Sequence, residues 1–280
     1  MRIALAQLAS TVEPSENLEL VREYTARAAG AGAGLVVFPE AMMCSFARPR
    51  ADAAEPWNGQ WATGVREAAA ASGIVVIAGM FTTTATERVH NSLLVSGPGV
   101  EARYDKLHLF DALGYAESRQ IAPGRSPVVV DLGGTQVGLA TCYDLRFPNL
   151  FTHLAGLGAE VIVVPASWAP GPNKVHQWRT LALARAMDST SFVVACGQAE
   201  PAAALAGRPL PTGVGHSVVA DPYGTCLLEL GSEPELAVVE LDLALVAEAR
   251  ERLPVLRHAR RFEERLLPAE GESQEYRAHH

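Results

Sequence analysis

The sequence predicts an α/β protein in which two mixed β-sheets pack against each other and helices lie outside them. Short runs of β-branched and aliphatic residues recur along the chain, and segments of helical periodicity lie between several of them. The stretches 74–95 and 214–241 have the pattern of hairpins and meanders, so part of the strand pairing is expected to be antiparallel.

Each predicted strand is an apolar run bounded by glycine, proline or polar residues. In chain order these runs are 3–8, 35–38, 74–80, 92–95, 128–132, 136–141, 161–164, 192–196, 217–220, 225–230 and 237–241. The first predicted helix begins at Pro14, and its apolar residues recur on one face. The predicted helices, which share this periodicity, are 14–29, 57–71, 147–157, 174–188 and 243–253. No Gly/Ser-rich or Pro-rich linker divides the chain.

Composition and charge exclude several classes of protein. Hydrophobic residues make up 49% of the 280 residues and charged residues 19%, which excludes a disordered chain. The net charge of −8 without a basic block argues against nucleic acid or an anionic membrane as a partner. No apolar run approaches the roughly 18 residues of a membrane span, and Gln7 interrupts the first run too early for a signal peptide. The four cysteines are far apart and form no CxxC pair, so we expect no disulfide, no metal site and a cytoplasmic location.

Cys142 has the most informative position among the cysteines. It follows the predicted strand 136–141 and precedes a helix that is expected to begin at Pro148. A thiol on such a turn would lie near backbone N–H groups and the positive end of the helix dipole, which would lower its pKa from about 8.5 toward neutrality. Cys142 is therefore a candidate nucleophile, and a buried structural cysteine is the alternative.

Two charged residues stand close to predicted strands. Glu40 ends the apolar run 35–39, where α/β proteins place active sites, and partial burial there would suit a general acid or base. The alternative is a helix-capping or ion-paired glutamate. Lys106 lies among apolar residues in the segment 104–111, where it could be directed at developing negative charge or, alternatively, reach the surface beside Asp105.

Three blocks of sequence carry more information together than any of these residues alone. They are Phe38-Pro-Glu40, Asp105-Lys-Leu-His-Leu-Phe-Asp111 and Thr141-Cys-Tyr-Asp-Leu-Arg-Phe-Pro148. In order and separation they resemble the three signature blocks of the nitrilase superfamily, the carbon–nitrogen hydrolases. Further similar blocks include Glu117-Ser through Pro123-Gly124, and Gly215-His-Ser217 with Asp221-Pro-Tyr-Gly224, so the resemblance covers nearly the whole chain.

This resemblance implies a fold, an assembly and a set of catalytic residues. The implied fold is a single domain over 1–280 with a four-layer αββα sandwich of two mixed sheets, and the polar segment 268–280 is expected to be a loosely held tail. The implied assembly is a homodimer or a higher homo-oligomer. The catalytic residues carried over are Glu40, Lys106 and Cys142, and Glu117 matches an additional glutamate of the family's site.

The implied chemistry is hydrolysis of a small linear amide through a thioester. Cys142 would attack as a thiolate after Glu40 takes its proton. Lys106 and the backbone N–H of Tyr143 would stabilise the oxyanion, and ammonia or an amine would leave. Water activated by Glu40 would then hydrolyse the thioester, while Glu117 would orient Lys106 or the substrate. The implied reaction needs no metal and no organic cofactor.

The block around Cys142 most resembles the small-amidase branch of the family, which includes omega-amidases and deaminated-glutathione amidases. Substrates of that branch carry a carboxylate, which Arg146, Arg179 or Lys174 could bind, and a structural ion pair is the alternative for each. Tyr143, Arg146 and Trp168 are the residues that we expect to bind substrate.

Two departures from the pattern of that branch leave the substrate open. Asn149 replaces the usual glutamate, and the loop 167–178 is similar to but not the same as the usual one, so both are expected to border the acyl pocket. Hydrolysis of a nitrile or of an N-carbamoyl amino acid with the same triad remains an alternative. An alternative of another class is a catalytically silent binding or scaffold protein.

Overall fold

The computed structural model describes residues 1–201 and 210–260, and the predicted tail 268–280 lies outside the described residues. The first sheet consists of β1 (Arg2–Gln7), β2 (Leu35–Val37), β3 (Val75–Thr83), β4 (Val89–Gly97), β5 (Val100–Asp105) and β14 (Glu235–Glu240). The second consists of β8 (Val128–Leu132), β9 (Thr135–Leu139), β10 (Val161–Ala166), β11 (Phe192–Gly197), β12 (Val218–Ala220) and β13 (Cys226–Glu229). A small hairpin joins β6 (Asp111–Ala112) and β7 (Tyr115–Ala116).

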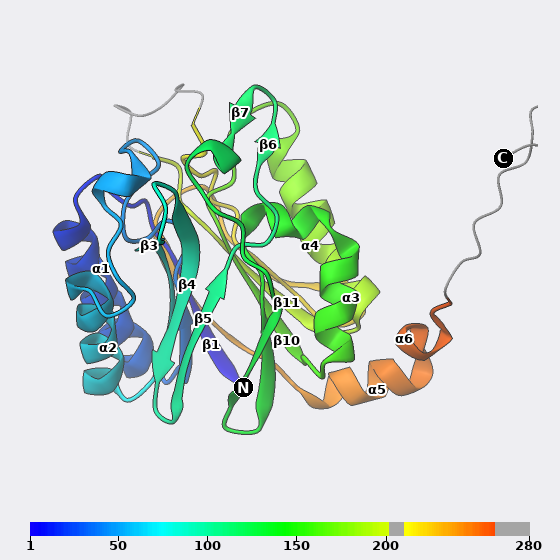
Figure 1. Ribbon diagram of the computed structural model, residues 1–280. Helices are drawn as coiled ribbons and strands as arrows, with labels where there is room; N and C mark the ends of the chain where they lie inside the picture. The colour runs from blue at the N-terminus through cyan, green and yellow to red at the C-terminus, as the bar shows by residue number, and fades with distance from the viewer. Residues whose placement is uncertain (202–209, 261–280) are drawn as a thin grey trace, which may run out of the picture.

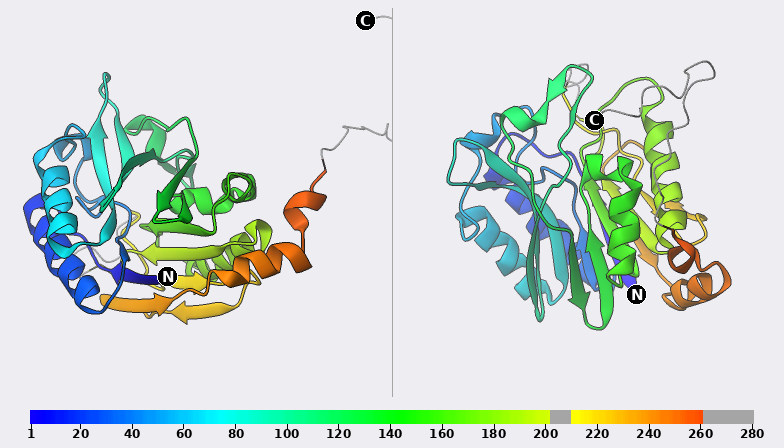
Figure 2. Two further views of the ribbon diagram at one scale, coloured as in Figure 1. Left: turned by 90° about the horizontal axis from the view of Figure 1, so that it is seen from below. Right: turned by 45° about the vertical axis from the view of Figure 1, so that its right-hand side comes forward.

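Helices cover the outer faces of the two sheets, and two more follow near the end of the described chain. They are α1 (Pro14–Gly30), α2 (Gln60–Ser72), α3 (Pro148–Gly156), α4 (Lys174–Ser189), α5 (Ala244–Arg252) and α6 (Val255–His258). Figures 1 and 2 show α1 and α2 outside the first sheet, α3 and α4 outside the second, and α5 and α6 extending away beyond them. The strand orders are β14-β1-β2-β3-β4-β5 and β13-β12-β11-β10-β9-β8. The predicted four-layer αββα sandwich of two mixed sheets is confirmed.

The central core lies between the two sheets. In β1, Ile3 and Leu5 point into this core, whereas Ala4 and Ala6 point into the separate core under α1 and α2. Because both faces of the inner strands are buried, their sequences are apolar throughout instead of alternating. This explains why continuous apolar runs marked most of the strands in the sequence.

Parallel pairing in the middle of each sheet brings several strand ends to one edge. In the first sheet β1, β2 and β3 are parallel, and in the second β9, β10 and β11 are parallel. Glu40 and Lys106 follow β2 and β5 of the first sheet, and Cys142 and Ser167 follow β9 and β10 of the second. The topology therefore brings side chains from both sheets to a common place.

Besides the short β6–β7 hairpin and α6, which were not predicted, two strands of the sheets differ from the sequence-based prediction. No strand was expected over Val100–Asp105, because β5 is an edge strand that alternates charged and apolar residues instead of forming an apolar run. The expected meander over 214–241 is wrong in its last strand: β14 leaves the second sheet and pairs antiparallel with β1. The side-chain amide of Gln7, in β1, donates to the carbonyls of Gly231 and Glu233 and so holds the crossing segment.

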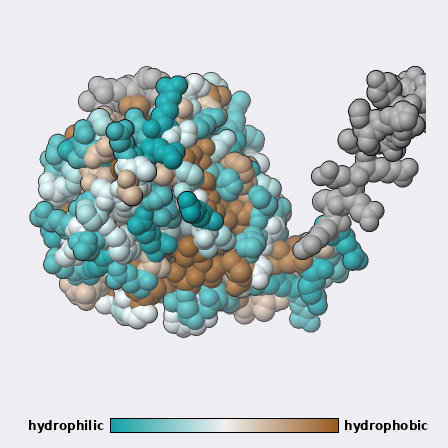
Figure 3. Space-filling model, in the orientation of Figure 1, coloured by the Kyte–Doolittle hydropathy of each residue, from teal (hydrophilic) through white to brown (hydrophobic). Residues whose placement is uncertain are grey.

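The two sheets approach each other along β5 and β8. Figure 3 shows apolar side chains gathered over this line, while hydrophilic side chains dominate the part of this face over α1 and α2. Partly buried Val100 and Val128 are among the residues that pack here onto the central core. Across the two described ranges, 1–201 and 210–260, the structure contains no helix with the length and hydropathy needed to cross a bilayer.

Candidate active site

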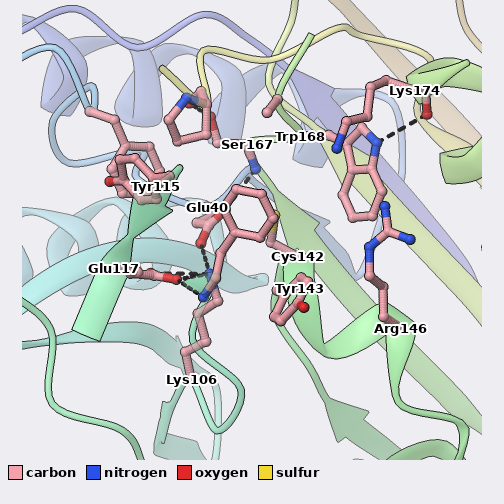
Figure 4. A pocket seen from close by; sticks show the side chains of 14 residues that line it. Glu40, Lys106, Tyr115, Glu117, Cys142, Tyr143, Arg146, Ser167, Trp168 and Lys174 are labelled. Atoms are coloured by element: carbon pink, nitrogen blue, oxygen red, sulfur yellow. Dashed lines mark hydrogen bonds and ion pairs between the residues drawn. The ribbon is translucent and has the colours of Figure 1, made fainter. Parts of the chain in front are cut away.

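A small pocket lies at the edge where β2, β5, β9 and β10 end. All seven residues singled out for the site line it: Glu40, Lys106, Glu117, Cys142, Tyr143, Arg146 and Trp168. In Figure 4 the carboxylates of Glu40 and Glu117 point toward the amine of Lys106, and the Cys142 side chain lies beside them. Residues that are far apart in the sequence therefore share one small cavity.

Lys106 is held between two carboxylates. Its Nζ donates to Glu40 Oε1 at 2.9 Å and to both oxygens of Glu117, at 3.1 and 2.9 Å, and all three side chains are at most 3% exposed. Burial opposes the charge on Lys106, but Glu117 and Glu40 outweigh it and raise the pKa of the ammonium group well above its usual value. The amine therefore stays protonated, and its charge is directed into the pocket.

Asn91, near the start of β4, completes this cluster and was not identified from the sequence. Its Nδ2 donates to Glu40 Oε1 at 2.7 Å and to Glu117 Oε1 at 3.2 Å. The backbone N–H of Ser167 donates to the other oxygen of Glu40 at 2.8 Å, and that of Phe110 donates to Glu117 Oε2 at 2.7 Å. Neither carboxylate has freedom to rotate. The only signal in the sequence is one amide residue beside a predicted apolar strand.

Cys142 begins a short 3₁₀-helix, Cys142–Arg146, with φ of +48°. A positive φ is uncommon for a non-glycine residue and marks the sharp turn between β9 and this helix. Burial, followed by the charge of Glu40, raises the pKa of the thiol well above its usual value, and Lys106 only partly opposes this. The expected lowering of the thiol pKa is therefore wrong: α3 begins at Pro148 as expected, but burial of the sulfur and the charge of Glu40 outweigh any effect of the helix.

Asp144 links the segment that carries Lys106 to the turn that carries Cys142. Its carboxylate accepts from Tyr104 Oη at 2.6 Å, from the backbone and Nδ1 of His108 at 3.0 and 2.7 Å, and from the backbone N–H of Thr141 at 2.8 Å. Burial and the neighbouring carboxylate raise the pKa of Tyr104 well above its usual value, so its hydroxyl remains a donor. One fully buried side chain thus joins the two sheets beside the pocket.

Replacing Asp144 by alanine is expected to destabilise the protein by about 3–5 kcal/mol, because it leaves several buried donors without an acceptor. The free energy of unfolding in urea, followed by circular dichroism, measures the effect. Asp131→Ala is the control, since Asp131 is exposed and accepts only local bonds, and it is expected to change stability by less than about 1 kcal/mol. Equal stabilities for the two variants would contradict the linking role of Asp144.

The far side of the pocket is aromatic and positively charged. Trp168 lies between two cations, with the Arg146 guanidinium carbon 4.9 Å and Lys174 Nζ 5.7 Å from its ring centre, and Lys174 Nζ is also 5.7 Å from the Phe110 ring centre. Neither cation has a carboxylate partner within salt-bridge distance among residues 1–201 and 210–260, and Arg146 donates to the amide oxygen of Gln177 instead. Burial and then the charge of Arg146 lower the pKa of Lys174.

The other residues considered from the sequence lie elsewhere. Arg179 forms an ion pair with Glu229 and does not line the pocket. Asn149 is exposed at the start of α3, so the expectation that it borders the pocket is wrong, whereas the loop 167–178 does contribute Ser167 and Trp168. In the described part of the chain, no group of three or more His, Cys, Asp and Glu side chains could hold a metal ion.

Comparisons with known proteins agree on one family. The family model for carbon–nitrogen hydrolases matches residues 2–251. A hydrolase from Mycobacterium tuberculosis is 52% identical over 270 residues, which are 94% of this chain and 96% of the relative. A deaminated glutathione amidase from Escherichia coli O157:H7 is 34% identical over 275 residues, which are 95% of this chain and all of the relative, 100%.

Solved structures show the same likeness. A carbon–nitrogen hydrolase superfamily protein from Xanthomonas campestris, with an arsenic adduct in its active site, matches with a TM-score of 0.82 and 27% identity, covering 94% of this chain and 98% of that one. An amidase variant from Nesterenkonia sp. AN1, with acrylamide added at its active-site cysteine, matches with a TM-score of 0.75 and 29% identity, covering 91% and 98%. Another variant of that amidase was solved in complex with butyramide.

Proposed function

The chain belongs to the carbon–nitrogen hydrolase family, and from that premise we propose that it hydrolyses the C–N bond of a small linear amide that carries a carboxylate. The reaction proceeds through a thioester on Cys142 and releases ammonia. One observation carries the proposal: a cysteine, a carboxylate and a buried ammonium group line the same pocket, as nucleophile, base and cation.

Acylation begins with the protonated thiol of Cys142. As sulfur attacks the amide carbon, the thiol proton moves to Glu40, and the carbonyl oxygen becomes an oxyanion. Lys106 Nζ and the backbone N–H of Tyr143 donate to that oxyanion. Glu40 then passes the proton to the nitrogen, the C–N bond breaks, ammonia leaves and the thioester remains.

Deacylation uses the same groups in reverse. A water molecule attacks the thioester carbon and gives a proton to Glu40, which returns it to the sulfur as the carboxylic acid leaves. Glu117 takes no proton in this scheme. Its two oxygens accept from Lys106, and Asn91 and the backbone N–H of Phe110 hold the carboxylate, so that Glu117 keeps the amine in place during both steps.

Arg146 and Lys174, which form no salt bridge within the described residues, support a substrate with a carboxylate. Arg146 and Lys174 lie on the side of the pocket opposite Lys106, and Trp168 keeps them in place. A carboxylate bound there offsets the burial and the repulsion from Arg146 that lower the pKa of Lys174. The named activity of the Escherichia coli relative, deaminated glutathione amidase, agrees with this assignment.

An ammonia-release panel tests the proposal directly. It compares glutaramate-type amides, deaminated glutathione, short aliphatic amides, N-carbamoyl amino acids and nitriles at equal concentrations. We expect the highest kcat/KM for amides that carry a carboxylate. Ammonia release from nitriles alone would instead indicate a nitrile hydrolase. Release of carbon dioxide with ammonia from carbamoyl compounds would indicate an N-carbamoyl amino acid hydrolase, and no turnover of any compound would indicate a catalytically silent protein.

Arg146→Met is expected to raise KM for glutaramate by about 10- to 100-fold, because a charge-assisted hydrogen bond to the substrate is lost. Butyramide is glutaramate without its carboxylate, so kcat/KM for butyramide is expected to stay within about twofold of the wild-type value. Steady-state ammonia release measures both. Arg179→Met serves as the matched control, because that arginine forms its ion pair outside the pocket. Equal losses for glutaramate and butyramide would remove Arg146 from substrate recognition.

A homodimer or a higher homo-oligomer is also part of the proposal. Met187 on α4 and Leu227 on β13 are 49% and 42% exposed, and such exposed apolar residues support a contact with a second copy of the chain. Light scattering after size-exclusion chromatography measures the assembly, and a monomer at micromolar concentration would contradict it.

A further inference from the structure

The side-chain amide of Asn91 lies between the two carboxylates of the pocket. We propose that Asn91 is a positioning residue that holds Glu40 so that its Oε2, and not Oε1, exchanges the proton with Cys142. This inference rests on the proposed function, since it assigns the proton transfer of that reaction to one oxygen atom.

The hydrogen bonds of Glu40 distinguish its two oxygens. Oε1 accepts from Asn91 Nδ2 at 2.7 Å and from Lys106 Nζ at 2.9 Å. A carboxylate oxygen offers about two lone-pair sites, so both sites of Oε1 are occupied. Oε2 accepts only the backbone N–H of Ser167, at 2.8 Å, and retains one site for a proton. Without Asn91, Oε1 would have a free site as well, and the carboxylate would have two competing acceptors.

The amide also stabilises the charge of the cluster. Two buried carboxylates face one ammonium group, so the three side chains together carry an excess negative charge. Asn91 Nδ2 donates to both carboxylates and so stabilises them without adding a charge of its own. The charged and titratable groups around this amide are Glu40, Glu117 and Lys106, with Cys142 beside Glu40.

The oxygen of the Asn91 side chain makes no use of the site, which indicates that the residue is present for its Nδ2 donors. Asn91 is 1% exposed, and its Oδ1 has no hydrogen-bond partner among the described residues. An unpartnered buried acceptor is unfavourable, and a leucine of similar shape would avoid it. The backbone of Asn91 fixes the side chain on a strand, because its carbonyl accepts from the backbone N–H of Lys106 at 2.9 Å.

The test uses Asn91→Leu, which removes the donors and keeps the volume. We expect kcat for glutaramate to fall about 10- to 100-fold while KM stays within about twofold, because proton transfer is impaired and substrate contacts are not. The acid limb of the kcat/KM profile is expected to move to higher pH, since lost hydrogen bonds to the ionised form favour protonation of the coupled cluster. If the leucine variant does not fold, Asn91→Ser gives the same comparison, because its hydroxyl is too short to bridge both carboxylates.

Ser92→Ala is the matched control. Ser92 is the next residue of β4, is equally buried, and bonds to Thr82 and Asp105 instead of the pocket. We expect wild-type kcat and pH dependence for this variant. If the wild type is active and folded Asn91→Leu keeps its kcat and pH profile, this inference is overturned while the proposed function stands. An equal loss of kcat in Ser92→Ala would have the same consequence. A wild type that is inactive on every compound of the panel would overturn the proposed function and this inference with it.

Discussion

Replacing Cys142 by alanine is expected to abolish amide turnover, with a loss on the order of 10⁵-fold or more in kcat. The methyl group cannot form the thioester, and no other side chain of the pocket is a comparable nucleophile. The fold should persist, because the exchange removes one buried sulfur atom and introduces no charge or polar group into the pocket. Steady-state ammonia release measures the loss, and thermal unfolding measures the fold.

Cys226→Ala provides the control for this experiment. Cys226 lies in β13, outside the pocket, and is only partly buried, so full activity is expected. Iodoacetamide should inactivate the wild type and the control alike by modifying Cys142, and modification of the partly exposed Cys226 should be absent from the control. Residual turnover of Cys142→Ala above a few per cent of the wild-type rate would exclude a thioester on this residue.

Lys106→Met is expected to lower kcat by about 10³-fold, because the main charged donor to the oxyanion is removed. Stability should also fall, by about 3 kcal/mol or more, since Glu40 and Glu117 lose their shared cation in a buried site. The pKa of the Cys142 thiol should rise further, because Lys106 is the group that lowers it. Rapid-quench measurement of the first turnover separates acylation from later steps.

Alkylation of the thiol serves as the internal control for this variant. Iodoacetamide should still modify Cys142, but the reaction should shift to higher pH, because less thiolate is present at any given pH. Slow acylation with preserved alkylation identifies the lysine as an oxyanion donor. A normal burst of ammonia from folded Lys106→Met would refute that role.

Much of the fold could be predicted because the inner strands are buried on both faces. The run 128–132 is a strand with the same bounds in the structure, and the helix from Lys174 begins where its periodicity predicted. The edge strand β5 could not be recognised in this way, since solvent on one side lets charged residues alternate with apolar ones. Nor could the partner of β14 be predicted, because an antiparallel strand of this length fits the edge of either sheet.

The main residues of the site could be predicted from the sequence, but the distances between them and the effects of those distances on their pKa values could not. Glu40, Lys106 and Cys142 lie together, as the resemblance of their blocks implied. The direction of the thiol pKa was predicted wrongly, because burial and a nearby carboxylate come from the tertiary structure. Asn91 was missed for the same reason, since a single amide in a strand has no signature until its two partners are known.

The first sheet supplies the base and the second supplies the sulfur. The core between them is built from apolar side chains such as Leu35 and Val37 from one layer and Val161 and Val163 from the other. A lateral slip of one layer by about 1 Å would misalign the reacting atoms and could cost on the order of 100-fold in rate, with no reacting residue altered. Mutations deep in this apolar interior, far from the pocket, would then change the measured rate of the enzyme.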